Sequence, residues 1–205
     1  MAACLTCPSG DYCPAGSVMV ADPLRLRYFA NLTAGKSTID ITNAGMSGAG
    51  LDSTETAAAT GALCVSVYTF APDQQLISCC SCAITPNGLA TLDVAQDLTS
   101  STLTPGVESS VTVELLASLP VSESCNNSAS APGPLASGME AWATTVHAAP
   151  SAGTFQATET PFTRATLSDT EFKKMTQLCG FIQADGSGYG ICNSCKVGAA
   201  GAAKR

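Results

Sequence analysis

Residues 63–70 read LCVSVYTF, and a Pro-Asp turn separates them from QQLISCC at 74–80. In the first stretch, β-branched and aromatic residues recur with a period of two, which is typical of a strand in a sheet. Proline followed by aspartate is a common turn that folds one strand back on another. The two stretches therefore predict an antiparallel hairpin. This hairpin would bring Cys64 close to Cys80 and Cys82, and we expect a disulfide to one of them.

The same periodicity recurs on both sides of this hairpin. Residues 24–31 and 36–43 alternate around Ala34-Gly35, which predicts a second hairpin. Turn-forming Ser, Thr, Pro and Gly separate the remaining alternating stretches. These further strands are expected at 89–95, 110–118, 139–148 and 154–160.

One helix is expected near the C-terminus. Ser168 and Glu171 have the spacing of a capping box, and Gly180 suits the left-handed residue that ends a helix. An apolar face at i, i+3 and i+7 would consist of Phe172, Met175 and Cys179.

These elements predict an all-β fold, namely a disulfide-stapled β-sandwich of about 7–8 strands with one short C-terminal helix. We divide the chain into three parts. Residues 1–23 form a Cys/Pro/Gly-rich N-terminal segment, 24–165 form the sandwich, and 166–205 hold the helix and a Cys/Gly-rich C-terminal segment.

The cysteines indicate the compartment. A cytosolic chain keeps many thiols mainly for metal, and metal sites usually also use histidine, of which this chain has 1. We therefore predict disulfides, while a zinc site or free thiols remain alternatives. The chain has 11 cysteines, an odd number, so one thiol is left over, either buried or available to a neighbouring chain. The cysteines are Cys4, Cys7, Cys13, Cys64, Cys79, Cys80, Cys82, Cys125, Cys179, Cys192 and Cys195.

A shared zinc would have to join the two Cys-x-x-Cys pairs at the ends of the chain. Their spacing within each pair suits a zinc site. The pairs are far apart in sequence, however, so the two termini would have to meet. We therefore predict no metal and no cofactor. The four cysteines of this alternative are Cys4, Cys7, Cys192 and Cys195.

Composition and charge exclude several classes of function. Charged residues make up 12% of the chain, whereas there are 22 Ser and 23 Thr, a surface chemistry common on extracellular structural proteins. The net charge is −7, and neither Lys nor Arg occurs between Lys36 and Arg164. A nucleic-acid partner is not expected, because phosphate binding needs clustered basic residues. No apolar run is long enough to predict a membrane span. The first residues also lack the charged start and apolar stretch of a secretion leader.

Motifs for catalysis and nucleotide binding have simpler interpretations. Residues 30–37 match a loose phosphate loop, but an alternating stretch follows them where a helix would be required. Residues 186–190 are a glycine turn without the surrounding βαβ unit. His147 could serve a Ser or Cys nucleophile, yet no nucleophile elbow accompanies it. Trp142, on the same strand, is expected in the core. We predict that the chain is not an enzyme. An unrecognised hydrolase remains an alternative, ranked third after the two functions given at the end of this section.

Two sequons would accept N-linked glycans if the source is eukaryotic. They are Asn31-Leu-Thr33 and Asn126-Asn-Ser128, so Asn31 and Asn126 are the candidate glycosylation sites.

Two segments resemble those of an uncharacterised family of secreted, Cys-rich proteins of Acidobacteria-type bacteria. One is LCVSVYTFAPDQQLISCCSCAITPNGLATLDV at 63–94, and the other is LCGFIQADGSGYGICNSC at 178–195. The resemblance covers about a quarter of the chain and rests on fairly specific cysteine spacings. It implies secretion and disulfides but no known activity.

These observations predict an extracellular structural subunit that self-assembles into a filament, pilus or surface layer. Its partners would be copies of itself, with glycans as a further partner class. The alternative is a monomeric secreted module that binds carbohydrate or a surface partner. Residues 18–31 are the best candidate for a strand donated to a neighbour, and pairing of 24–31 with 36–43 inside one subunit is the competing interpretation.

Overall fold

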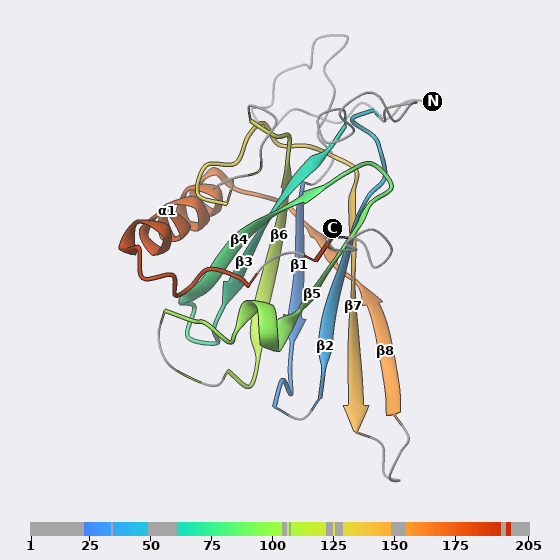
Figure 1. Cartoon of the computed structure of the whole chain (residues 1–205), viewed down its shortest axis with the longest axis vertical. Helices are drawn as coiled ribbons and strands as arrows, with labels where there is room; N and C mark the ends of the chain where they lie inside the picture. Colours follow the sequence, from blue (N-terminus) through green and yellow to red (C-terminus); the bar gives the residue numbers. More distant parts are fainter. Residues whose placement is uncertain are drawn as a thin grey trace, which may run out of the picture.

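The computed structural model describes residues 23–33, 35–48, 61–103, 106, 108–121, 125, 129–148, 155–193 and 196–197. Over these residues the chain forms two antiparallel five-stranded sheets and one long helix (Figure 1). The predicted β-sandwich with a single C-terminal helix is therefore confirmed. The described part contains ten strands instead of seven or eight.

One sheet lies between the helix and the other sheet, so we call the two the central sheet and the outer sheet. The central sheet has the order β4-β3-β6-β1-β9, with β1 at Leu24–Phe29, β3 at Leu63–Phe70, β4 at Leu76–Ile84, β6 at Val111–Ser118 and β9 at Thr163–Ala165. The outer sheet has the order β10-β5-β2-β7-β8, with β2 at Ser37–Asn43, β5 at Leu89–Asp93, β7 at Met139–Ala148, β8 at Phe155–Pro161 and β10 at Lys196–Val197. A π-helical turn, η1 at Val94–Leu98, follows β5.

The two sheets pack face to face around the main core. Alternate residues of each strand point into this layer, as the periodicity of two requires. The central sheet contributes Val65, Val67, Val111, Val113 and Leu115, and the outer sheet contributes Ile39, Ile41, Ala90, Leu92, Met139, Ala141 and Ala143.

The helix α1, Asp169–Asp185, covers the other face of the central sheet. Met175, Cys179 and Ile182 are buried there, in a second cluster that includes Tyr68 and Leu116. Every residue of β3 is buried because the strand lies between the helix and the outer sheet. The central sheet is thus the middle of three layers (Figure 1).

The predicted start of the helix is confirmed, and its predicted end is wrong. Ser168 accepts a hydrogen bond from Glu171 N at 3.1 Å, as an N-cap does. The helix continues through Gly180 and ends at Gly186, whose φ of 68° is left-handed. Gly180 stays helical because packing at Cys179 and Ile182 outweighs the weak helix propensity of one glycine.

The predicted hairpin of 24–31 with 36–43 is wrong. β1 pairs with β6 and β9 in the central sheet, whereas β2 pairs with β5 and β7 in the outer sheet. Alternation predicts a strand but does not identify its partner. Here β1 has apolar residues on both faces: Leu24 packs in the cluster below the helix, and Phe29 packs between the sheets.

Trp142 is not in the core, contrary to expectation. The buried residues of that part of β7 are Met139, Ala141 and Ala143, so Trp142 points to the opposite face and is half-buried. Its alternation with Val146 is real, but small residues occupy the inner positions of this strand.

Two segments pass from one sheet to the other and cover the sides of the sandwich. β8 leads through Phe162 into β9, and the buried Phe162 ring lies 6.1 Å from that of Phe29. At the other side, Ile191 bridges to Cys79 of β4, and β10 then pairs with β5. No helix in the described part of the chain is long and apolar enough to cross a membrane.

Candidate functional site

The disulfide of Cys64 differs from the expectation. Cys64 bonds to Cys125, with Cα atoms 5.3 Å apart, and not to Cys80 or Cys82. In the β3–β4 ladder, Cys82 stands opposite Val65 and Cys80 opposite Val67. Residues directly opposite share a face, and neighbours along a strand point to opposite faces. Cys64 therefore points away from both cysteines.

The neighbouring cysteines of β4 use the same alternation to hold two different segments. Cys79 points toward the helix and bonds to Cys179, and Cys80 bonds to Cys192. Cys82 is also disulfide-bonded. Because Cys192 is bonded to Cys80, it is not available to the zinc alternative. The disulfide prediction also covered four cysteines that lie outside the described residues, namely Cys4, Cys7, Cys13 and Cys195.

The residues considered for catalysis do not form a site. His147 is exposed on β7, and its Nε2 lies 3.3 Å from Thr158 Oγ1 of β8. The phosphate-loop match at 30–37 connects two strands and starts no helix. Gly188 and Gly190 lie in a turn, with φ of 81° and 74°. In the described part of the chain, no three His, Cys, Asp or Glu side chains could hold one metal ion.

The sequons have different outcomes. Asn31 is exposed just after β1 in the left-handed region, with φ 56°, so its side chain is accessible. Asn126 lies outside the described residues. Glycosylation stays a prediction for both.

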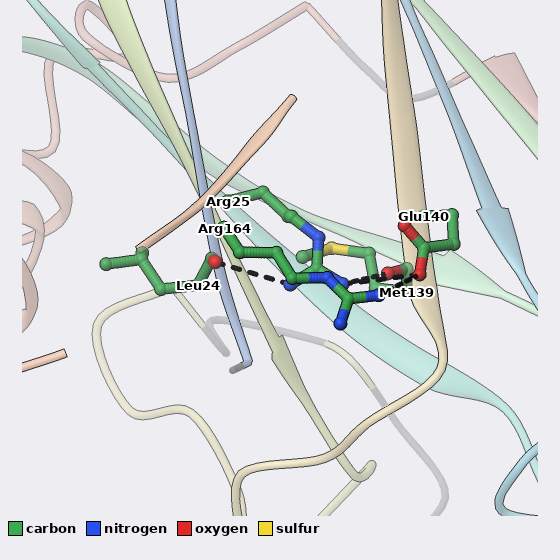
Figure 2. Close-up of polar contacts among 5 residues, drawn as sticks. All are labelled: Leu24, Arg25, Met139, Glu140 and Arg164. Atoms are coloured by element: carbon green, nitrogen blue, oxygen red, sulfur yellow. Dashed lines mark hydrogen bonds and ion pairs between the residues drawn. The ribbon is translucent and has the colours of Figure 1, made fainter. Parts of the chain in front are cut away.

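A pair of arginines holds the N-terminal end of β7 to the central sheet. Arg25 of β1 and Arg164 of β9 stand directly opposite each other, and both reach Glu140 of β7 (Figure 2). Arg25 Nη2 is 3.4 Å and Arg164 Nη2 is 3.1 Å from Glu140 Oε1. Arg25 is buried and also donates to the carbonyl oxygen of Met139 at 3.0 Å. Together with Phe162 N, which donates to Ala141 O at 2.9 Å, these contacts fix one end of the β7–β8 ribbon.

Away from these contacts, β8 is open to solvent. Gln156, Ala157, Thr158 and Glu159 are all exposed, so both faces of the strand lack a covering layer. β8 is the last strand of the outer sheet, and no other strand in the described part pairs with its outer side. In Figure 1 it lies at the side of the molecule, at the right of the view.

The ladder register shows which main-chain groups of β8 face outward. The hydrogen bond from Phe162 N to Ala141 O makes these two residues a hydrogen-bonded pair. Hydrogen-bonded and non-bonded pairs alternate in antiparallel sheets. The N–H and C=O groups of Ala157 and Glu159 therefore point away from β7. Pro161 occupies the same kind of position, where its missing N–H does not weaken the ladder.

A half-buried carboxylate side chain lies on the helix side of the central sheet. Glu114 of β6 lines a pocket of about 330 Å³ with Phe70, Glu171 and Lys174. Its Oε2 is buried without a hydrogen-bond partner among the described residues. Burial raises the pKa of Glu114, the nearby charge of Glu171 raises it further, and Lys174 lowers it.

Comparisons with known proteins show little similarity. No protein-family model and no curated protein matches the chain. A crystal structure from Thermotoga maritima aligns with 72% of this chain and 97% of its own, at 8% identity and a TM-score of 0.42. A likeness this weak carries no argument about function, and the resemblance to secreted Acidobacteria-type proteins stays a prediction.

The open ribbon was not among the sites predicted from the sequence. The signals available were Pro161 at the end of an alternating stretch and the near absence of large apolar residues in 156–160. Proline within a strand pattern indicates an edge strand. Both signals point to the edge of a sheet.

Proposed function

We propose that the chain is an extracellular structural subunit, not an enzyme, that self-assembles into a filament, pilus or surface layer through the outer side of β8. The observation that carries this proposal is the pair of outward-facing residues, Ala157 and Glu159, on a strand exposed on both faces. Such an edge is a template for a strand of another chain.

A second copy of β8 fits this edge in a symmetric, antiparallel arrangement. If Thr158 pairs with itself across a two-fold axis, residue 155 stands opposite 161 and Ala157 opposite Glu159. The outward-facing residues of one copy then meet those of the other. Each Glu159 carboxylate faces an alanine, so like charges are not directly opposed. This is an isologous contact, with the same surface on both subunits.

One such contact would be weak, because it supplies about four main-chain hydrogen bonds. A filament needs a second contact, and the central sheet offers one. β9 pairs with Leu24, Arg25 and Leu26 only, which leaves Arg27, Tyr28 and Phe29 of β1 without a strand on that side in the described part. Two different contacts per subunit propagate a linear assembly, in which many weak contacts act together.

The remaining features fit an extracellular location. Three disulfides join parts of the described chain that are 61, 100 and 112 residues apart. Disulfides persist in oxidising compartments. The edge contact takes the place of strand donation by residues 18–31 in our proposal, since β1 already lies between β6 and β9 of its own chain.

Proline substitution at the edge tests the assembly. Ala157→Pro removes an outward N–H while the bonds between β7 and β8 remain, and Ala157→Thr keeps that N–H. We expect negative-stain electron microscopy to show fibres or sheets for the wild-type protein and for A157T but not for A157P. All three proteins should have the same thermal unfolding midpoint.

Two results would contradict the proposal. If A157P forms the same fibres as the wild type, the β8 contact is wrong. If the wild-type protein stays monomeric in light scattering at every concentration, self-assembly is wrong and a monomeric binding module becomes the better interpretation.

A further inference from the structure

A depression rich in hydroxyl groups lies beside the π-helical turn η1. It consists of two hollows, of about 450 Å³ and about 280 Å³, which share Ser100 and Gly106. Among the described residues that line it, Glu108 alone carries a charge. The hydroxyl-bearing residues of the lining are Thr33, Thr99, Ser100, Ser101, Thr102 and Tyr189.

Tyr189 stands at one wall of the larger hollow, with 58% of its surface exposed. Its backbone is held firmly: Gly190 N donates to Ser101 O at 2.6 Å, and Cys79 N donates to Gly190 O at 2.8 Å. Gly190 has a φ of 74°, and a Cβ there would come within 2.7 Å of an Ile182 side-chain carbon. The backbone next to Tyr189 is therefore held in place, and it presents the exposed aromatic ring at the wall of the hollow.

The polar groups of the depression are also oriented in advance. Ser100 Oγ donates to Gln96 O at 2.5 Å, and Thr99 Oγ1 donates to Ala95 O at 3.3 Å. Asn193 Nδ2 donates to Ser100 Oγ at 2.9 Å. Because a hydroxyl has one donor and two acceptor lone pairs, the donors are directed into the protein while acceptor capacity remains on both oxygens.

We propose that this depression binds neutral oligosaccharides. A pyranose ring can place its C–H face on the Tyr189 ring and donate its hydroxyl hydrogens to the Ser and Thr oxygens. An anionic ligand does not fit, since neither Lys nor Arg is among the described lining residues and Glu108 would repel it. This inference does not depend on the assembly contact, because no residue of β8 lines the depression.

Native affinity electrophoresis tests the proposal, with hydroxyethyl cellulose, soluble starch, xylan and galactomannan as neutral polymers and alginate as the anionic one. We expect at least one neutral polymer to retard the wild-type protein. Tyr189→Ala should weaken that binding about tenfold, through loss of the stacking surface. Tyr189→Phe should keep it. The matched control is Phe181→Ala, which removes an aromatic ring that is 67% exposed on α1 and lines neither hollow.

A second variant keeps the test decisive if Tyr189→Ala does not fold. Gly106→Trp fills both hollows from a position where a Cβ has ordinary space, and it should also abolish retardation. The proposal is overturned if no neutral polymer retards the wild-type protein or if alginate alone does. It is also overturned if folded Y189A or G106W binds as tightly as the wild type. A negative result in this test would not affect the comparison of A157T with A157P by electron microscopy, which tests the assembly contact separately.

Discussion

Glu140 is the acceptor for two guanidinium groups, and one of them, on Arg25, is buried. We expect Glu140→Gln to lower the free energy of unfolding by about 1–3 kcal/mol, because a buried charged donor loses its anionic partner. Urea denaturation measures the change. The control is Glu159→Gln, an exposed residue of β8 that should change stability by less than about 0.5 kcal/mol. Equal effects of both variants would rule out a special role for the arginine pair.

The raised pKa of Glu114 gives the free energy of unfolding a pH dependence of a definite sign. Its pKa in the folded protein lies above that in the unfolded chain, chiefly through burial and then through Glu171. The folded state therefore binds this proton more tightly, and the stabilisation is present below the unfolded pKa and lost as pH rises through the folded pKa. Glu114→Gln should increase stability at neutral pH, and the increase should shrink toward acid pH. Urea titrations at several pH values test this, and an increase that is the same at every pH would contradict it.

At the scale of elements, the helix depends on the disulfide between Cys79 and Cys179. Replacing both residues by Ala should lower stability by about 3 kcal/mol, as expected for a closed loop of about 15 residues, because the intact bond between Cys80 and Cys192 already shortens the path between Cys79 and Cys179. It should also increase hydrogen exchange in α1 more than in β3, because the helix loses its covalent link to β4. The pair Cys64→Ala with Cys125→Ala is the control: it should destabilise the protein without a selective effect on α1. Uniform exchange in both double variants would argue against a separately held helix.

Sequence periodicity predicted the strands far better than their partners. β3 and β7 coincide with the ranges 63–70 and 139–148, because alternation is a property of the strand itself. The pairing of β1 with β2 was wrong because apolar residues on both faces of β1 suit a middle layer, which only the complete fold reveals. The open edge of β8 was missed although Pro161 and the lack of large apolar residues in 156–160 indicate it. The three residues of β9 are too few for any periodicity.

At the scale of the whole molecule, β1 is part of the central sheet and cannot be a free N-terminal arm. Deleting residues 1–31 removes β1, the Leu24 contact below the helix and one of the arginines on Glu140. We expect this variant to lose its cooperative thermal transition and to accumulate as insoluble protein, whereas deletion of 1–22 should retain the transition. Circular dichroism on heating distinguishes the two. A soluble, cooperatively folded protein after the longer deletion would show that β1 is dispensable.

The bond between Cys80 and Cys192 limits how far the protein can be stretched. Pulled from residue 23 and residue 197, a reduced chain would release about 170 residues, or roughly 600 Å of extended backbone. In the oxidised chain, the bond between Cys80 and Cys192 carries the tension past the residues between them. Only residues 23–80 and 192–197 can then extend, which is about 60 residues or roughly 200 Å. When it unfolds under tension at these two ends, the oxidised subunit would therefore lengthen about three times less than the reduced one.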